Sequence, residues 1–137
     1  MKVITFGDIM DGGRSVFTSV ATLDGARLKV AFEGEIRIDN PHKHLGRYLE
    51  ELAEALADAE VEETLLDFTA LRFCNSNGFY IIMDLTEAVY ENTEGPVTVR
   101  RLREDDWQQE TLAILIDIDE DPIRERTTFL DIDADET

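Results

Sequence analysis

The sequence predicts one α/β domain of the α+β kind, in which a mixed β-sheet carries helices mainly on one face and is preceded by an N-terminal β-hairpin. Three observations predict it. Residues 14–39 contain a run rich in β-branched and apolar residues, a hairpin-turn signal and then a strand that alternates between apolar and polar side chains. Two later stretches repeat apolar residues at helical spacing, and an apolar strand lies between those stretches. Strands joined through helices tend to pair in parallel, so we expect the later strands to form the parallel part of the sheet.

The N-terminal hairpin is predicted over residues 14–39. Its first strand, from Val16 to Leu23, is rich in β-branched and apolar residues and is followed by Asp24-Gly25, a strong signal for a two-residue hairpin turn. The returning strand places Leu28, Val30, Phe32, Ile36 and Ile38 on one face at a period of two, with Gly34 in the same register. We therefore expect this strand to have one buried face and one wet face.

Two amphipathic helices are predicted on either side of a buried strand around Leu65–Phe68. Asn40 is the expected N-cap of the first helix and Pro41 its first residue, while the second helix runs from about Asn77 to Asn92. The expected inward positions are Leu45, Leu49, Leu52, Leu56 and Ala59 in the first helix, and Phe79, Ile82, Met83, Thr86, Val89 and Tyr90 in the second.

One more strand and one more helix follow before order is expected to decline. The strand begins near Val97, after a turn, and the third helix begins at Asp105-Asp106. Beyond it the chain carries acids and few strong core positions. We expect a single domain over residues 1–120 and an acidic C-terminal tail over residues 121–137 that is partly ordered at best.

The charge of the chain restricts its partners. The 137 residues include 31 acidic and 13 basic side chains, which give a formal net charge of -18. Such a surface repels phosphate backbones and anionic lipids, so we expect no nucleic-acid and no membrane partner, and a basic patch on a protein is the natural complement. With one cysteine, no signal-peptide pattern and no apolar run of membrane-spanning length, the predicted location is cytoplasmic.

The stretch from Leu65 to Phe79 is the most informative, because an apolar strand there runs into a polar turn that starts a helix. The turn is Asn75-Ser76-Asn77-Gly78, and it places Ser76 at a helix N-terminus, where unpaired N–H groups and the helix dipole favour a phosphate. The alternative is that Ser76 or Asn77 only caps the helix and that Gly78 only permits close packing.

This stretch also resembles the signature of the STAS domain, the family of bacterial anti-sigma factor antagonists and related modules. The matching residues are Leu65 to Thr69 in the strand, Leu71 to Cys74 after it, and Asn75 to Gly78 in the loop. In the family the first serine of the loop, which aligns with Ser76, is often phosphorylated by a partner kinase. Asn75 stands where the family usually has an acid and Asn77 where it has a second serine. The resemblance covers roughly residues 14–120, with its specific residues within 65–90.

The resemblance implies a non-enzymatic regulatory protein of the partner-switching type. Its expected partners are a serine kinase of the histidine-kinase fold or an anti-sigma-like regulator, which phosphorylation releases, and a phosphatase that resets the site. The chain itself would be a monomer or weak homodimer with no cofactor, no metal and no catalytic residue. The expected phosphoacceptor is Ser76, and the expected partner-binding residues are Asn75, Ser76, Asn77, Gly78, Phe79, Tyr80 and Met83. A phosphate on so acidic a face would add about -1.5 to -2 charges and eject the partner.

Two other functions stay open. One is a constitutive STAS-like interaction module without phosphorylation, which Asn75 in place of the acid favours. The other is an enzyme that uses Cys74, whose thiol would be activated at a helix N-terminus but has no base near it in sequence. The structural interpretation of Cys74 is a buried residue without chemistry.

Three further clusters have a structural and a functional interpretation. His42 and His44, with Asp39, suggest a metal site, but they lie two apart at a helix start and point in different directions. The acids from Asp117 to Asp121, and again from Asp131 to Asp135, begin a calcium-loop pattern without its glycine and its final glutamate, so a solvated acidic tail is the better interpretation. The basic cluster, Arg100, Arg101 and Arg103, either pairs with local acids or contacts a partner's carboxylates. Arg100 or Arg101 would also reach a phosphate on Ser76 if the strand order brings this segment beside it.

Overall fold

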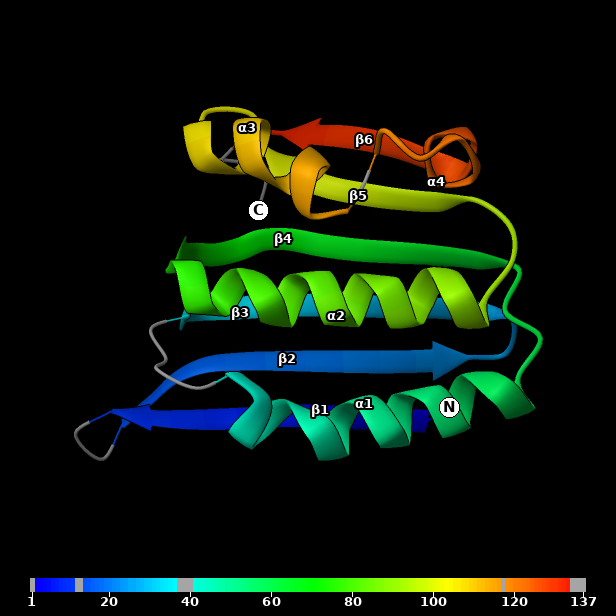
Figure 1. Ribbon diagram of the computed structural model, residues 1–137, viewed down its shortest axis with the longest axis horizontal. Helices are drawn as coiled ribbons and strands as arrows, with labels where there is room; N and C mark the ends of the chain where they lie inside the picture. Colours follow the sequence, from blue (N-terminus) through cyan, green and yellow to red (C-terminus); the bar gives the residue numbers. More distant parts are fainter. Residues whose placement is uncertain (1, 12–13, 37–40, 117, 134–137) are drawn as a thin grey trace.

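The computed structural model describes residues 2–11, 14–36, 41–116 and 118–133, and within these only the backbone of residues 5–11, 14–17, 41–45 and Asn77. In this part of the chain six strands form one sheet in the order β1-β2-β3-β4-β5-β6. The strands are β1 (Lys2–Asp11), β2 (Arg14–Asp24), β3 (Arg27–Ile36), β4 (Glu63–Cys74), β5 (Val97–Leu102) and β6 (Thr127–Ile132). The helices are α1 (Pro41–Asp58), α2 (Ser76–Asn92), α3 (Asp106–Leu115) and α4 (Asp121–Arg126). Figure 1 shows α1 and α2 lying along one face of this sheet.

The sheet is mixed, as the sequence predicts. Strands β1, β2 and β3 are antiparallel, whereas β3, β4, β5 and β6 pair in parallel, and helices lie between the parallel strands in sequence. The predicted fold class, a mixed sheet with helices mainly on one face, is therefore confirmed.

The predicted hairpin is the β2–β3 pair. Asp24 pairs with Arg27, so the two turn residues are Gly25 and Ala26, one position later than Asp24-Gly25 suggests. Gly25 has a φ of 61°, which a two-residue hairpin turn needs and glycine adopts at little cost. The strand before it, β1, was not predicted as a separate element. Ile38 and the expected helix cap Asn40 lie outside the described residues.

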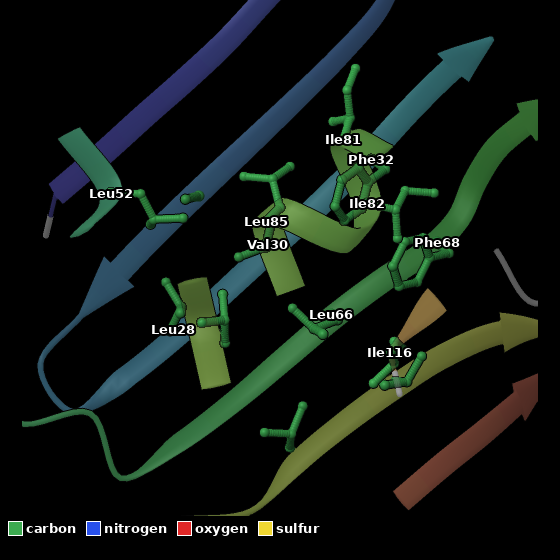
Figure 2. Packing of buried hydrophobic residues seen from close by; sticks show 14 of the residues in the cluster. Leu28, Val30, Phe32, Leu52, Leu66, Phe68, Ile81, Ile82, Leu85 and Ile116 are labelled. Atoms are coloured by element: carbon green, nitrogen blue, oxygen red, sulfur yellow. The ribbon is translucent and has the colours of Figure 1, made fainter. Parts of the chain in front are cut away.

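The core lies between the sheet and the helices. Figure 2 shows side chains of β3 and β4 meeting those of α2, with Phe32 and Phe68 side by side at its centre. Their rings are stacked, with centroids 4.6 Å apart, and both side chains are buried. The alternation predicted for β3 is confirmed, because Leu28, Val30, Phe32 and Ile36 are all buried.

The inward face of α2 differs from the predicted one at Met83. Ile81 and Leu85 are fully buried, whereas 38% of Met83 is exposed. The helix packs against the sheet and also against α1, so its buried face is wide and includes adjacent positions such as Ile81 and Ile82. Met83 lies outside this face.

The segment predicted as an acidic tail is folded over residues 121–132, where it forms α4 and β6. Strand β6 pairs in parallel with β5 along its whole length, from Val97 opposite Thr127 to Leu102 opposite Ile132. Acids of this segment are ion-pair partners: Asp131 binds Arg101 and Asp133 binds Arg103. The guanidinium of Arg101 also lies 4.1 Å above the ring of Phe129. Composition suggests a solvated tail here because these partners lie about 30 residues away in sequence.

Among the described residues, no helix has both the length and the apolar character that crossing a membrane requires.

Candidate functional site

The junction between β4 and α2 is held from both sides by Asn75. The backbone N–H of Asn75 donates to the carbonyl of Ile36 at the end of β3, 2.9 Å away. Its side-chain Oδ1 accepts from the N–H of Gly78 at 2.8 Å, and its carbonyl accepts from the N–H of Phe79 at 3.2 Å. The helix start is thus fixed to the neighbouring strand.

Asn75 is therefore the N-cap of α2, where the sequence suggests Ser76 or Asn77. Its backbone is extended, with φ of -79° and ψ of 173°, and the helix begins at the next residue. Asparagine is among the best N-cap residues, so the identity of the cap was readable from the sequence. Ser76 lies at the first helical position and is exposed, since capping is done by its neighbour. The predicted placement of Ser76 at a helix N-terminus is confirmed.

Gly78 is buried and serves close packing. A Cβ at this position would overlap Cγ2 of Ile36 and would lie 2.8 Å from Sγ of Cys74. The absence of a side chain lets the first turn of α2 approach β3 and β4 closely. Of the expected partner-binding residues, Gly78 is thus buried, whereas Ser76, Tyr80 and Met83 are exposed.

Three side chains of α2 point outward on successive turns: Ser76, Tyr80 and Met83. Tyr80 is 52% exposed and Met83 38% exposed, and the spacings of four and three residues place them on one face. We call these three residues the α2 stripe. Phe79, between them, is partly buried and stacks on Trp107 of α3, with ring centroids 6.5 Å apart. Only the backbone of Asn77 is described, and it lies in the first turn.

Cys74 has the properties of a structural residue. It is buried, and burial raises the pKa of its thiol to about 12. The thiol is therefore protonated at neutral pH, whereas a cysteine nucleophile reacts as the thiolate. Its Sγ lies 3.5 Å from the carbonyl oxygen of Asn75, so it packs inside the junction.

The three arginines of the basic cluster pair with carboxylates. Arg100 binds Asp67 at 2.9 Å, Arg101 binds Asp131 at 2.9 and 3.3 Å, and Arg103 binds Asp133 at 2.7 Å. The local ion-pair interpretation is thus confirmed. The hypothesis that Arg100 or Arg101 reaches a phosphate on Ser76 is wrong. Arg100 lies opposite Asp67, and Cys74 is seven residues further along β4, about 23 Å at the rise of a strand.

The remaining candidate clusters lie largely outside the side chains that the structure describes. Within the described residues, no group of three or more His, Cys, Asp or Glu side chains could hold a metal ion. His42 and His44 lie in the first turn of α1, where only the backbone is described. Asp39, Asp117 and Asp135 lie outside the described residues, and Asp121, at the start of α4, pairs with Arg124.

Sequence reasoning missed one residue that supports the backbone leading to the junction, Gln108. Its side chain is fully buried, and its Nε2 donates to the carbonyls of Phe68 and Leu71, at 2.9 and 3.0 Å. Its Oε1 accepts from the N–H of Leu102 at 2.7 Å. The paired residues of β4 and β5 end at Asp67 and Arg100, so Gln108 satisfies the backbone of β4 where it diverges toward the junction. A glutamine on an amphipathic helix gives no sequence signal for this role.

Comparisons with known proteins give the following likenesses. No protein-family model matches the sequence, and no curated protein matches it. One similar solved structure is that of the anti-sigma factor antagonist SpoIIAA in its unphosphorylated form, with 12% identity and a TM-score of 0.49 over 86% of this chain and 90% of that one. Another is an anti-sigma factor antagonist from Mycobacterium paratuberculosis, with 19% identity and a TM-score of 0.43 over 75% of this chain and 80% of that one. At these values the likenesses give no information about individual site residues.

Proposed function

We propose that this chain is a non-enzymatic regulatory module of the partner-switching type, a divergent STAS-like protein that binds a regulator through the α2 stripe and is switched by phosphorylation of Ser76. The observation that carries the proposal is the exposed side chain of Ser76 at a helix start that Asn75 caps, in line with the exposed side chains of Tyr80 and Met83. An exposed aromatic and an exposed methionine on one helix face are typical of a protein-binding surface.

The position of Ser76 suits a reversible phosphate. The first turn of α2 has backbone N–H groups without helical partners, and Asn75 satisfies one of them through Gly78. The positive end of the helix dipole stabilises an added dianion there. Modification is therefore compatible with the folded protein.

The same phosphate would oppose a bound partner. Ser76 lies one turn from Tyr80, so a partner that covers the α2 stripe would have to bury about two negative charges beside an aromatic side chain. We expect the unmodified protein to bind and the phosphorylated protein to release. The resemblance of the junction to STAS domains supports a serine kinase of the histidine-kinase fold, or an anti-sigma-like regulator, together with a phosphatase as partners, in the cytoplasm.

Site-mapping mass spectrometry on the protein from its native cells, with phosphatases inhibited, tests the switch. We expect a phosphoryl group on Ser76. We expect none on Thr86, which is buried and donates to the carbonyl of Met83, and none on Thr69, whose hydroxyl donates to Asp67 at 2.6 Å. A bare Ser76 across growth conditions would contradict the proposal.

Binding measurements separate the effect of a charge at Ser76 from a general effect of net charge. Once a partner is isolated, we expect Ser76→Glu to weaken binding strongly and Ser76→Ala to preserve it. Ala57→Glu is the matched control, because it adds one charge to an exposed position of α1 away from the α2 stripe. Equal weakening by both glutamate variants would indicate a general effect of net charge.

The second candidate is a constitutive interaction module. It is favoured by Asn75, which occupies the position of the acid that the family usually has and serves here as the N-cap. An affinity that is unchanged in Ser76→Glu would support this function over the switch.

A further inference from the structure

A groove lies on the helical face of the molecule, between α2 on one side and the end of α3 and α4 on the other. Its volume is about 400 Å³. Its apolar lining comes from Met83 of α2, from Leu115 and Ile116 at the end of α3, and from Ile123 of α4. Leu115 and Ile116 are buried, whereas Met83 is exposed and both Ile123 and the lining residue Tyr90 are half-buried.

The rim of the groove is acidic on both sides. Asp84 and Glu91 lie on α2 and Glu120 precedes α4, and no lysine or arginine is among the described residues that line the groove. Both arginines of α4 have partners, and the guanidinium of Arg126 lies 5.2 Å from the ring centre of Tyr90, which lines the groove. Arg124 pairs with Asp121, and Arg126 donates to the carbonyls of Tyr90 and Gly95. By contrast, Asp67 of β4, Asp131 of β6 and Asp133 just after β6 each have an arginine partner.

The groove continues the α2 stripe, because Met83 belongs to both. From Ser76 to Glu91 the helix rises about 22 Å, at 1.5 Å per residue. A partner segment of about four helical turns can therefore contact the stripe at one end and the groove at the other.

We propose that the groove binds a basic amphipathic segment of the protein partner, which rests on the α2 stripe being the partner surface. Apolar side chains of that segment pack against Met83 and Ile123, while its lysines or arginines lie against Asp84, Glu91 and Glu120. The acidic rim selects a basic partner and speeds association, as complementary charges do. Phosphorylation acts at the other end of the surface, where Ser76 and Tyr80 lie. Selection of the partner and its release by phosphorylation therefore use different ends of one surface.

A synthetic amphipathic peptide of about four helical turns, with leucines at helical spacing and lysines between them, is the probe. Its binding to the full chain is followed by fluorescence anisotropy of a dye on the peptide. The double variant Glu91→Gln with Glu120→Gln should weaken binding by about two- to tenfold, as expected for two rim charges. Glu50→Gln with Glu54→Gln on α1 removes the same charge from exposed positions outside the groove and should leave binding within about twofold.

The contribution of the apolar part of the groove is tested by a second pair of variants, one inside the groove and one outside it. Met83→Ser should weaken binding of the peptide, whereas Ile114→Ser should not, because Ile114 is 71% exposed on α3 and does not line the groove. A scrambled peptide of the same composition, which lacks an apolar face, should bind more weakly than the amphipathic one.

Several results would overturn the inference: no saturable binding of the peptide, equal loss in the groove and α1 charge variants, or equal binding of the scrambled peptide. The second and third would indicate attraction to net charge only. The peptide-binding measurement does not depend on whether Ser76 is phosphorylated in cells. If the groove variants weaken peptide binding while Ser76 is never modified, the groove is a binding site and the phosphorylation switch is contradicted. If Ser76 is modified while the groove variants bind the peptide as the wild type does, the switch is supported and the groove inference is contradicted.

Discussion

At the β4–α2 junction, some residues hold the structure together and another is exposed at the surface. Asn75 fixes the helix start to β3, and Gly78 lets the first turn pack against Ile36 and Cys74. Ser76, which lies between them, is exposed, and the capping and close packing of the junction are done by Asn75 and Gly78. A modification of Ser76 can therefore alter the surface without unfolding the junction.

The same glycine-to-alanine change should have opposite effects at two sites. Gly78→Ala should destabilise the protein by about 1–3 kcal/mol, because the added methyl group overlaps Ile36 in a packed interior. Gly46→Ala should stabilise it by up to about 1 kcal/mol, because Gly46 lies in α1 with nothing within 4 Å of the new Cβ and alanine favours the helix. Urea unfolding of both variants tests this. A Gly78→Ala variant as stable as the wild type would show that the first turn of α2 is not tightly packed, and a destabilised Gly46→Ala variant would contradict the prediction for α1.

At the scale of elements, the docking of β6 completes the sheet and uses the acids of the C-terminal segment. The carboxylate of Asp131 accepts from Arg101 and also from Gln109 of α3, which donates at 2.9 Å. Gln109 also donates to the carbonyl of Leu102 at the end of β5. One carboxylate thus joins β6 to both β5 and α3.

Docking of β6 should therefore weaken in acid. The hydrogen bond from Gln109, followed by the bonds and charge of Arg101, holds the pKa of Asp131 below its ordinary value of 3.8. A carboxylate with a depressed pKa contributes stability above that ordinary value and loses it as the pH falls through the folded-state pKa. We expect Asp131→Asn to be less stable than the wild type at pH 7, with a difference that shrinks below about pH 4.

Unfolding midpoints of the two proteins across this pH range provide the measurement. A stability difference that is independent of pH would mean that the interaction of Asp131 does not depend on its charge. Asp133→Asn is a useful comparison, because Asp133 pairs with Arg103 at a more exposed position of the same segment.

For the molecule as a whole, the net charge of -18 opposes the compact state. The carboxylates that pair with arginines of β5 and the residues after it offset part of the repulsion, whereas the acidic rim of the groove adds to it. Like charges that are far apart repel one another through solvent, and dissolved salt screens this repulsion.

Stability should consequently rise with salt at low ionic strength. The screening length falls from about 30 Å at 0.01 M to about 8 Å at 0.15 M, so sodium chloride in this range should raise the unfolding midpoint. Glu91→Gln with Glu120→Gln should reduce the salt dependence, since it removes two unscreened acids. A midpoint that falls with salt would show that attractive ion pairs dominate over the net charge.

The sequence by itself determined the elements that depend on neighbours in the chain. Alternation defined β3, the glycine at position 25 marked the hairpin turn, and the polar turn after an apolar strand placed Ser76 at the start of α2. Each of these is a local preference of the backbone, so a short window of sequence contains the information.

Only the tertiary structure decided which distant residues meet. Acids that appeared to belong to a solvated tail pair with arginines about 30 residues away and form β6, and Met83, predicted to face inward, lines an exposed groove with Ile123. The physical reason is that ion pairing, strand pairing and the rotation of a helix on its sheet depend on contacts between segments, which no local period encodes.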